Sequence, residues 1–104
     1  MFGESYVEVV LIGDTFDDAY EAAKQSSEQM HQQFIHPFND PKVIEGQATV
    51  GLEIIDQSEH PIHYVFLPVG GGGLAAGVAT VFKTISPETF SFILAPIPNS
   101  AVAT

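Results

Sequence analysis

The chain has 104 residues, 45 % hydrophobic and 11 % aromatic, which suits one small globular domain. Three lysines and no arginine stand against 13 acidic residues, and the formal net charge of −10 argues against nucleic acid or an anionic membrane as a partner. The absence of cysteine excludes disulfides and thiolate metal sites.

No apolar run approaches the roughly 18–20 residues that a membrane-spanning helix needs. The first ten residues, MFGESYVEVV, lack the basic region, hydrophobic stretch and cleavage site of a secretory signal. We therefore expect a cytoplasmic protein without a membrane partner.

The N-terminal third of the chain predicts a strand, a helix and a second short strand. Residues 7–12, VEVVLI, are rich in β-branched side chains, which is typical of a buried strand. Residues 14–29 carry apolar side chains at helical spacing, with Asp14 or Thr15 as the N-cap. A weak strand is expected at 32–36, QQFIH.

The remainder predicts a regular alternation of helices and strands. A second helix is expected over 40–57, with Asp40 as its cap and a proline at its first position. Strands are expected at 63–69 and 90–96, with a helix of small residues over 74–85 between them. Strands alternating with helices predict an α/β fold with a parallel sheet.

Four consecutive glycines, residues 70–73, lie where a predicted strand turns into a predicted helix. A glycine inside a regular element costs roughly 0.5–1 kcal/mol relative to alanine, so four in a row need a reason. Close approach of the backbone to an anion at a helix N-terminus supplies one. A P-loop is excluded, because Leu74 and Ala75 stand where it needs lysine and a hydroxyl residue.

A dinucleotide fingerprint of the form G-x-G-x-x-A is met by Gly70, Gly72 and Ala75. That site also needs an acidic residue at the end of the next strand, where this chain reads Leu-Ala-Pro over 94–96. We therefore favour a single phosphate monoester, held by glycine N–H groups and by the helix N-terminus behind them. A glycine-rich turn without a ligand is the alternative.

Three stretches together resemble one family: EVVLIGDTFDDAYEAA, FIHPFNDPKVIEGQATVGLEI and FLPVGGGGLAAGV. Their order and spacing are similar to those of threonine dehydratase (threonine ammonia-lyase), a fold-type II pyridoxal-phosphate enzyme related to serine dehydratase and serine racemase. The resemblance covers roughly residues 2 to 96. It implies that the cofactor is pyridoxal phosphate and that its phosphate is bound by Gly70, Gly71, Gly72, Gly73 and Leu74.

The resemblance also implies an architecture and a reaction. The chain would be a fragment of the tryptophan synthase beta-like fold, with residues 1–39 in the small domain that covers the cofactor, 40–57 as a crossover helix and 58–104 in the large domain. Intact members of this lyase family eliminate water from threonine or serine, giving a 2-oxo acid and ammonia, as in isoleucine biosynthesis. The implied partners are the cofactor, the amino-acid substrate and further copies of the chain.

The family's Schiff-base lysine lies in a motif that contains arginine, and this chain has none. Lys24, Lys42 and Lys83 all stand in polar or helix-end settings, so we expect them to be solvated and assign no catalytic residue. Whether this chain is an enzyme is left open. The alternative is a non-catalytic, stand-alone or cassette-type domain that binds a phosphate compound or a partner subunit.

Two residues depart from the family pattern. Ala48 adds a methyl group where the family motif Gly-Gln-Gly-Thr has a glycine, which puts a tight helix contact in question. Ala95 replaces an acid that in racemase-like relatives helps to bind a divalent cation, so no metal site is expected.

The histidines and the acidic run have structural explanations. We expect His36 to cap the end of a strand. His60 and His63 are three residues apart around a proline, which suits neither a helical metal pair nor a catalytic dyad. A solvated helix face is expected for Asp14, Asp17, Asp18 and Glu21.

Overall fold

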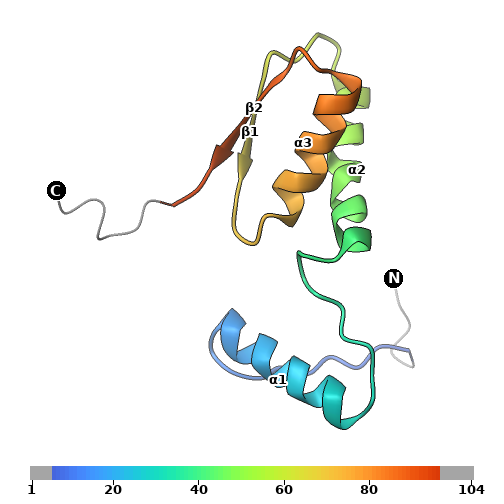
Figure 1. Cartoon of the computed structure of the whole chain (residues 1–104), viewed down its shortest axis with the longest axis vertical. Coiled ribbons are helices and arrows are strands. Elements are labelled where there is room, and N and C mark those ends of the chain that lie inside the picture. Colours follow the sequence, from blue (N-terminus) through green and yellow to red (C-terminus); the bar gives the residue numbers. More distant parts are fainter. Residues whose placement is uncertain (1–5, 97–104) are drawn as a thin grey trace, which may run out of the picture. The chain divides into compact units, whose positions relative to one another are not determined.

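The computed structural model describes residues 6–96, and the chain divides into two compact units, residues 1–35 and 36–104. The first unit contains helix α1 (Phe16–Gln29). The second contains, in chain order, α2 (Pro41–Gln57), β1 (Tyr64–Pro68), α3 (Gly73–Ile85) and β2 (Phe90–Leu94) (Figure 1). No helix within residues 6–96 is both long enough and apolar enough to cross a membrane.

Helix α1 begins with a reciprocal cap. The Thr15 hydroxyl accepts a hydrogen bond from the Asp18 N–H at 3.2 Å, and the Asp18 carboxylate accepts from the N–H groups of Thr15 at 3.3 Å and Asp14 at 3.2 Å. These bonds satisfy N–H groups that have no partner inside the helix. Asp18 was expected only to lie on a solvated helix face, but its carboxylate is part of the helix cap.

The predicted strands at 7–12 and 32–36 are wrong, because the structure has neither within the described residues. Residues 7–12 run as an irregular segment whose side chains are largely exposed, Leu11 at 91 % and Val9 at 78 %. A strand exists only when a neighbour accepts and donates its backbone hydrogen bonds. The composition of these segments suits a sheet, but no other strand of the described chain pairs with them.

The predicted helix over 40–57 is confirmed as α2. Its N-cap is Asp40, whose carboxylate accepts from the Lys42 N–H at 2.8 Å, and Pro41 occupies the first position, where no N–H is needed. Glycines on both helices let α2 pack closely on α3. A Cβ on Gly51 would lie 3.1 Å from the Val81 Cβ, so the two helices nearly touch there.

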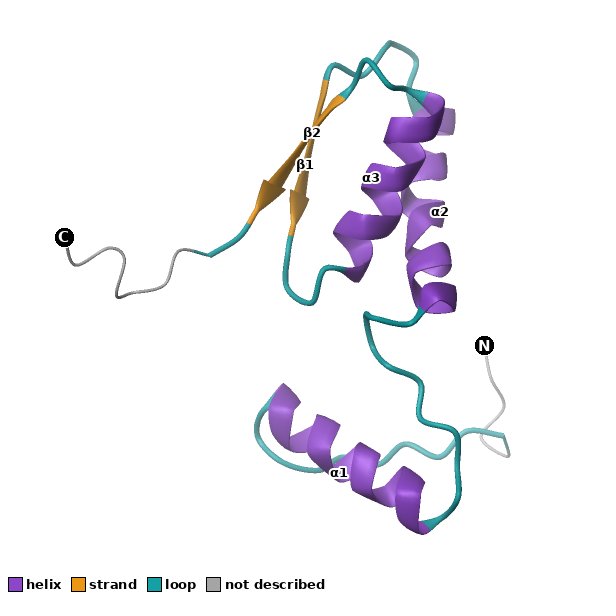
Figure 2. Ribbon diagram, viewed as in Figure 1, coloured by secondary structure: helices purple, strands orange, loops and turns teal. Residues whose placement is uncertain are grey.

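Strands β1 and β2 pair in parallel, with Tyr64 opposite Phe90 and Pro68 opposite Leu94. Helix α3 connects them, so the predicted α/β fold with a parallel sheet is confirmed. Figure 2 shows both helices of this unit on one side of the sheet. The buried core lies between α3 and the sheet and consists of Leu67, Ala75, Val78 and Phe82.

Candidate functional site

The four glycines connect β1 to α3, as predicted. The segment is tied at both ends: Val69 donates its N–H to the Leu94 carbonyl at 2.9 Å, and the Gly72 carbonyl accepts from the Ala76 N–H at 2.9 Å. Gly72 is the N-cap of α3 and has a φ of 96°, a left-handed conformation that a side chain would strain. The backbone therefore turns sharply from the carboxyl end of a strand into the N-terminus of a helix.

The N–H groups of this turn have no protein partner in the described part of the chain. Within residues 6–96, the N–H groups of 71–75 donate to no protein acceptor, and no side chain caps α3. They stand at the positive end of the helix dipole, where an acceptor from outside, water or an anion, is favoured. The turn can therefore bind an anion without a cationic side chain.

The four glycines are not equivalent. A Cβ on Gly71 would clash with ring atoms of Phe38, and one on Gly73 would lie 2.8 Å from the Phe38 carbonyl oxygen. Gly72 is explained by its positive φ. Gly70 has no such explanation, because its φ is not positive and nothing lies within 4 Å of the place a Cβ would take. The space beside Gly70 is open.

The sequence patterns did not single out Phe38, and the prediction that His36 caps the end of a strand is wrong. His36 caps a turn instead of a strand: its Nδ1 accepts from the N–H of Phe38 at 3.3 Å and of Asn39 at 2.9 Å. Residues 6–35 contain no strand for His36 to cap, while the turn that follows offers two N–H groups. The stretch HPF was visible as part of the family resemblance, but contact with the glycines joins residues more than 30 positions apart, and no local pattern reveals it.

The other candidate residues form no reactive cluster. Lys24, Lys42 and Lys83 are exposed, as are His60 and His63. Among residues 6–96, no group of three or more histidine, cysteine or acidic side chains could hold a metal ion. Hydrogen bonds from the Asp14 N–H, the Thr15 hydroxyl and the Thr15 N–H lower the pKa of Asp18, but this carboxylate belongs to the cap of α1.

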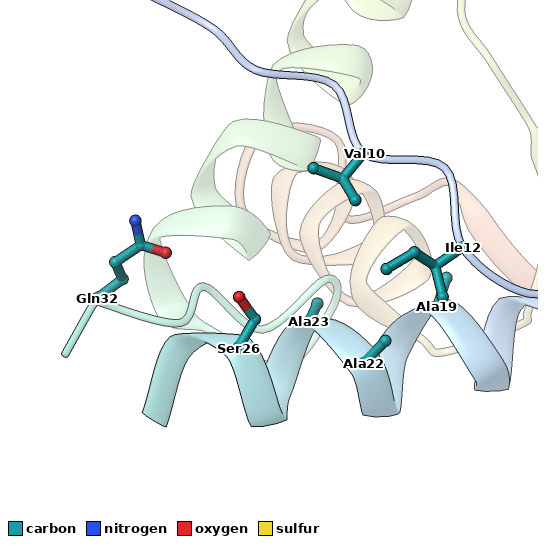
Figure 3. A pocket seen from close by; sticks show the side chains of 7 residues that line it. All are labelled: Val10, Ile12, Ala19, Ala22, Ala23, Ser26 and Gln32. Carbon is teal, nitrogen blue, oxygen red and sulfur yellow. The ribbon is translucent and has the colours of Figure 1, made fainter. Parts of the chain in front are cut away.

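A groove in the first unit contains none of the predicted site residues. It measures about 240 Å³ and lies between the irregular segment of residues 7–12 and α1 (Figure 3). Its lining is mainly apolar and has no titratable side chain: Val10, Ile12, Ala19, Ala22, Ala23, Ser26 and Gln32. Such a groove can hold an apolar side chain but offers no titratable acid or base.

Known proteins are similar to this chain in both sequence and fold. A model of the pyridoxal-phosphate dependent enzyme family matches residues 1–104. The biosynthetic L-threonine dehydratase of Halalkalibacterium halodurans is 50 % identical over 88 residues, which are 85 % of this chain and 21 % of that protein. The processed form of threonine deaminase isoform 2 from Solanum lycopersicum superposes with a TM-score of 0.74 at 53 % identity, over 84 % of this chain and 24 % of that one.

Serine racemase from Dictyostelium discoideum is also similar, with a TM-score of 0.64 and 36 % identity over 80 % of this chain and 27 % of that one. The chain thus spans about a fifth of the length of the Halalkalibacterium halodurans dehydratase and about a quarter of that of the Solanum lycopersicum deaminase. The family model covers the chain from end to end, and the glycine turn lies within the matched region. This chain belongs to the family of pyridoxal-phosphate dependent enzymes.

Proposed function

We propose that the glycine turn binds the phosphate of pyridoxal phosphate through Gly70, Gly71, Gly72, Gly73 and Leu74. One observation carries the proposal: within residues 6–96 the N–H groups of 71–75 donate to no protein acceptor, and nothing lies within 4 Å of the place that a Cβ on Gly70 would take. Three of the glycines have an explanation inside the protein, whereas room for a ligand is what explains the fourth.

The chemistry of the turn fits a phosphate monoester. Successive N–H groups at a helix N-terminus donate to phosphate oxygens, and the helix dipole favours the negative charge. The net charge of −10 opposes any anion at long range. Short N–H contacts must therefore provide the binding free energy, and binding should depend only weakly on salt compared with a lysine-rich phosphate site.

We further propose that the sequence is part of a threonine dehydratase-like enzyme. Its similarity to proteins named threonine dehydratase and threonine deaminase supports this activity. Bound pyridoxal phosphate supplies the electron-withdrawing ring that allows an amino acid to lose its Cα proton. The part played by this chain is to hold and orient the phosphate end.

The wider assignments belong to the same proposal. Residues 1–39 form part of the small domain, 40–57 the crossover helix and 58–104 part of the large domain. The whole enzyme takes threonine or serine as its substrate, assembles from identical copies and works in the cytoplasm.

Amide chemical shifts in a ¹⁵N-labelled chain test the phosphate site. Inorganic phosphate, and then pyridoxal phosphate, should shift the amide signals of 71–75 saturably. The variant Gly70→Ala should keep its fold, since its Cβ meets no protein atom, but should bind at least about tenfold more weakly, because the Cβ occupies the ligand's space. Gly46→Ala is the matched control: its Cβ also meets nothing, and it lies in α2. Unshifted amides, or equal binding by Gly70→Ala, would overturn the proposal.

A further inference from the structure

Phe38 lies directly against two of the four glycines. Its ring occupies the place that a Cβ on Gly71 would take. Its main chain does the same at Gly73, where a Cβ would lie 2.8 Å from the carbonyl oxygen and 3.2 Å from the Cα of Phe38. The glycines at 70 and 72 have nothing within 4 Å on the corresponding side. Gly71 and Gly73 thus both contact Phe38, which lies in a segment distant along the chain.

Phe38 is itself held in place. The His36 imidazole accepts the N–H of Phe38, and the edge of one ring meets the face of the other, with centroids 4.5 Å apart and planes at 89°. Pro37, between them, restricts φ. Two residues further on, Asp40 caps α2. Phe38 is therefore fixed between a hydrogen-bonded turn and the start of a helix that packs on α3.

This contact does not use the N–H groups of the turn, as far as the described residues show their bonds. A phenyl ring is not an acceptor that competes for amide protons, and the Phe38 carbonyl approaches Gly73 on the side of the missing Cβ. Within residues 6–96, no protein hydrogen bond involves the N–H of Gly71 or Gly73. Phe38 can thus restrain the backbone while the donors remain available for an anion.

We infer that Phe38, held by His36, is a positioning residue that keeps the glycine turn in its anion-binding conformation. The inference rests on the proposed phosphate site. Four glycines in sequence have wide conformational freedom, and ordering them at the moment of binding would weaken affinity. The ring and main chain of Phe38 restrict that freedom beforehand. This explains why positions 71 and 73 must lack side chains even though their φ values are ordinary.

Backbone relaxation of the ¹⁵N-labelled chain measures this role directly. Phe38→Ala removes the ring from Gly71 but keeps the main chain and Cβ that lie against Gly73. We therefore expect the amide order parameter of Gly71 to fall from a rigid value of about 0.85 toward about 0.6, and that of Gly73 to change less. Phosphate binding should weaken about tenfold, because the turn must then be ordered on binding. Phe38→Tyr keeps the ring and should restore both. Phe90→Ala removes an equally aromatic side chain from β2, away from the turn, and should change neither.

A double-mutant cycle separates positioning from a general loss of stability. When Phe38 is present, Gly71→Ala should disrupt the turn and lower the free energy of unfolding. The loss should be far smaller in the Phe38→Ala background, where the ring no longer blocks the added Cβ. Equal costs in both backgrounds, or order parameters unchanged in Phe38→Ala, would overturn the positioning role. Failure of the native chain to respond to inorganic phosphate would instead overturn the proposed phosphate site.

Discussion

The backbone of Ala48 in α2 lies directly against Gly77 in α3. A Cβ on Gly77 would come within 2.7 Å of the Ala48 nitrogen and 2.6 Å of the Ile44 carbonyl oxygen. The helices therefore pack closely at the position where Ala48 replaces the family's glycine. The tight contact questioned from the sequence is present, and the missing side chain of Gly77 is what makes room for it.

Replacing Gly77 with alanine should destabilise the chain. The added methyl meets main-chain atoms, which cannot rotate away, so we expect a cost of about 1–3 kcal/mol in the free energy of unfolding. Gly46→Ala, also in a helix interior but with open space, should instead stabilise by about 0.5–1 kcal/mol. Urea unfolding followed by circular dichroism measures both. Equal stabilisation by the two substitutions would show that the helices do not touch at Gly77.

The cap of α1 should make its stability depend on pH. Hydrogen bonds, the strongest from the Asp14 N–H, hold the pKa of Asp18 below its ordinary value. A carboxyl group whose pKa is lower in the folded than in the unfolded state stabilises the folded state at pH values above its unfolded pKa. That stabilisation is lost as the pH falls through the folded pKa. Helicity of α1 should therefore decrease in acid below about pH 4. Titration of the Asp18 carboxyl carbon by NMR, alongside circular dichroism, would follow the loss.

Two substitutions isolate this effect. Asp18→Asn should remove the pH-dependent part, whereas Asp17→Asn, in the same first turn but outside the cap, should leave it in place. Thr15→Ala should lower the free energy of unfolding by about 1 kcal/mol, as is typical when an N-cap side chain is removed. The explanation fails if Asp17→Asn abolishes the acid transition and Asp18→Asn does not.

The sheet face opposite α3 should promote self-association. It is made of stacked, exposed aromatic rings: Tyr64, Phe66, Phe90 and Phe92. Exposed apolar patches mark interaction surfaces, and the net charge of −10 repels copies at low salt. Light scattering should therefore show a larger mean mass as salt increases. Phe66→Ser should reduce the effect, while Phe16→Ser, which removes a similarly exposed ring from α1, should not. A monomer at high salt would contradict this.

The 104-residue polypeptide by itself should have no dehydratase activity on threonine or serine. A lysine that bonds to the cofactor needs a pKa lowered by burial or by a neighbouring cation, and Lys24, Lys42 and Lys83 are exposed. Borohydride reduction with pyridoxal phosphate should label them weakly and without preference. Stoichiometric labelling of one lysine, together with 2-oxobutanoate formed from threonine, would prove this prediction wrong.

Elements whose signals are local could be predicted from the amino-acid sequence. All three helices and the strands β1 and β2 lie where periodicity and composition predicted them. The cap at Asp40 was predicted, and the cap of α1 was narrowed to Asp14 or Thr15, of which the structure has Thr15. Both were readable because a capping side chain bonds to backbone only two or three residues away. The position of the glycine turn between β1 and α3 was also predicted, because four consecutive glycines are a local signal.

Pairing and contact between distant segments could be seen only in the folded chain. Residues 7–12 have the composition of a strand but no strand beside them within the described chain, and a ladder cannot form from one side. The separate roles of the glycines became visible when Phe38 was found against Gly71 and Gly73. A missing Cβ has meaning only relative to the atom that takes its place, and that atom here comes from a segment more than 30 residues away.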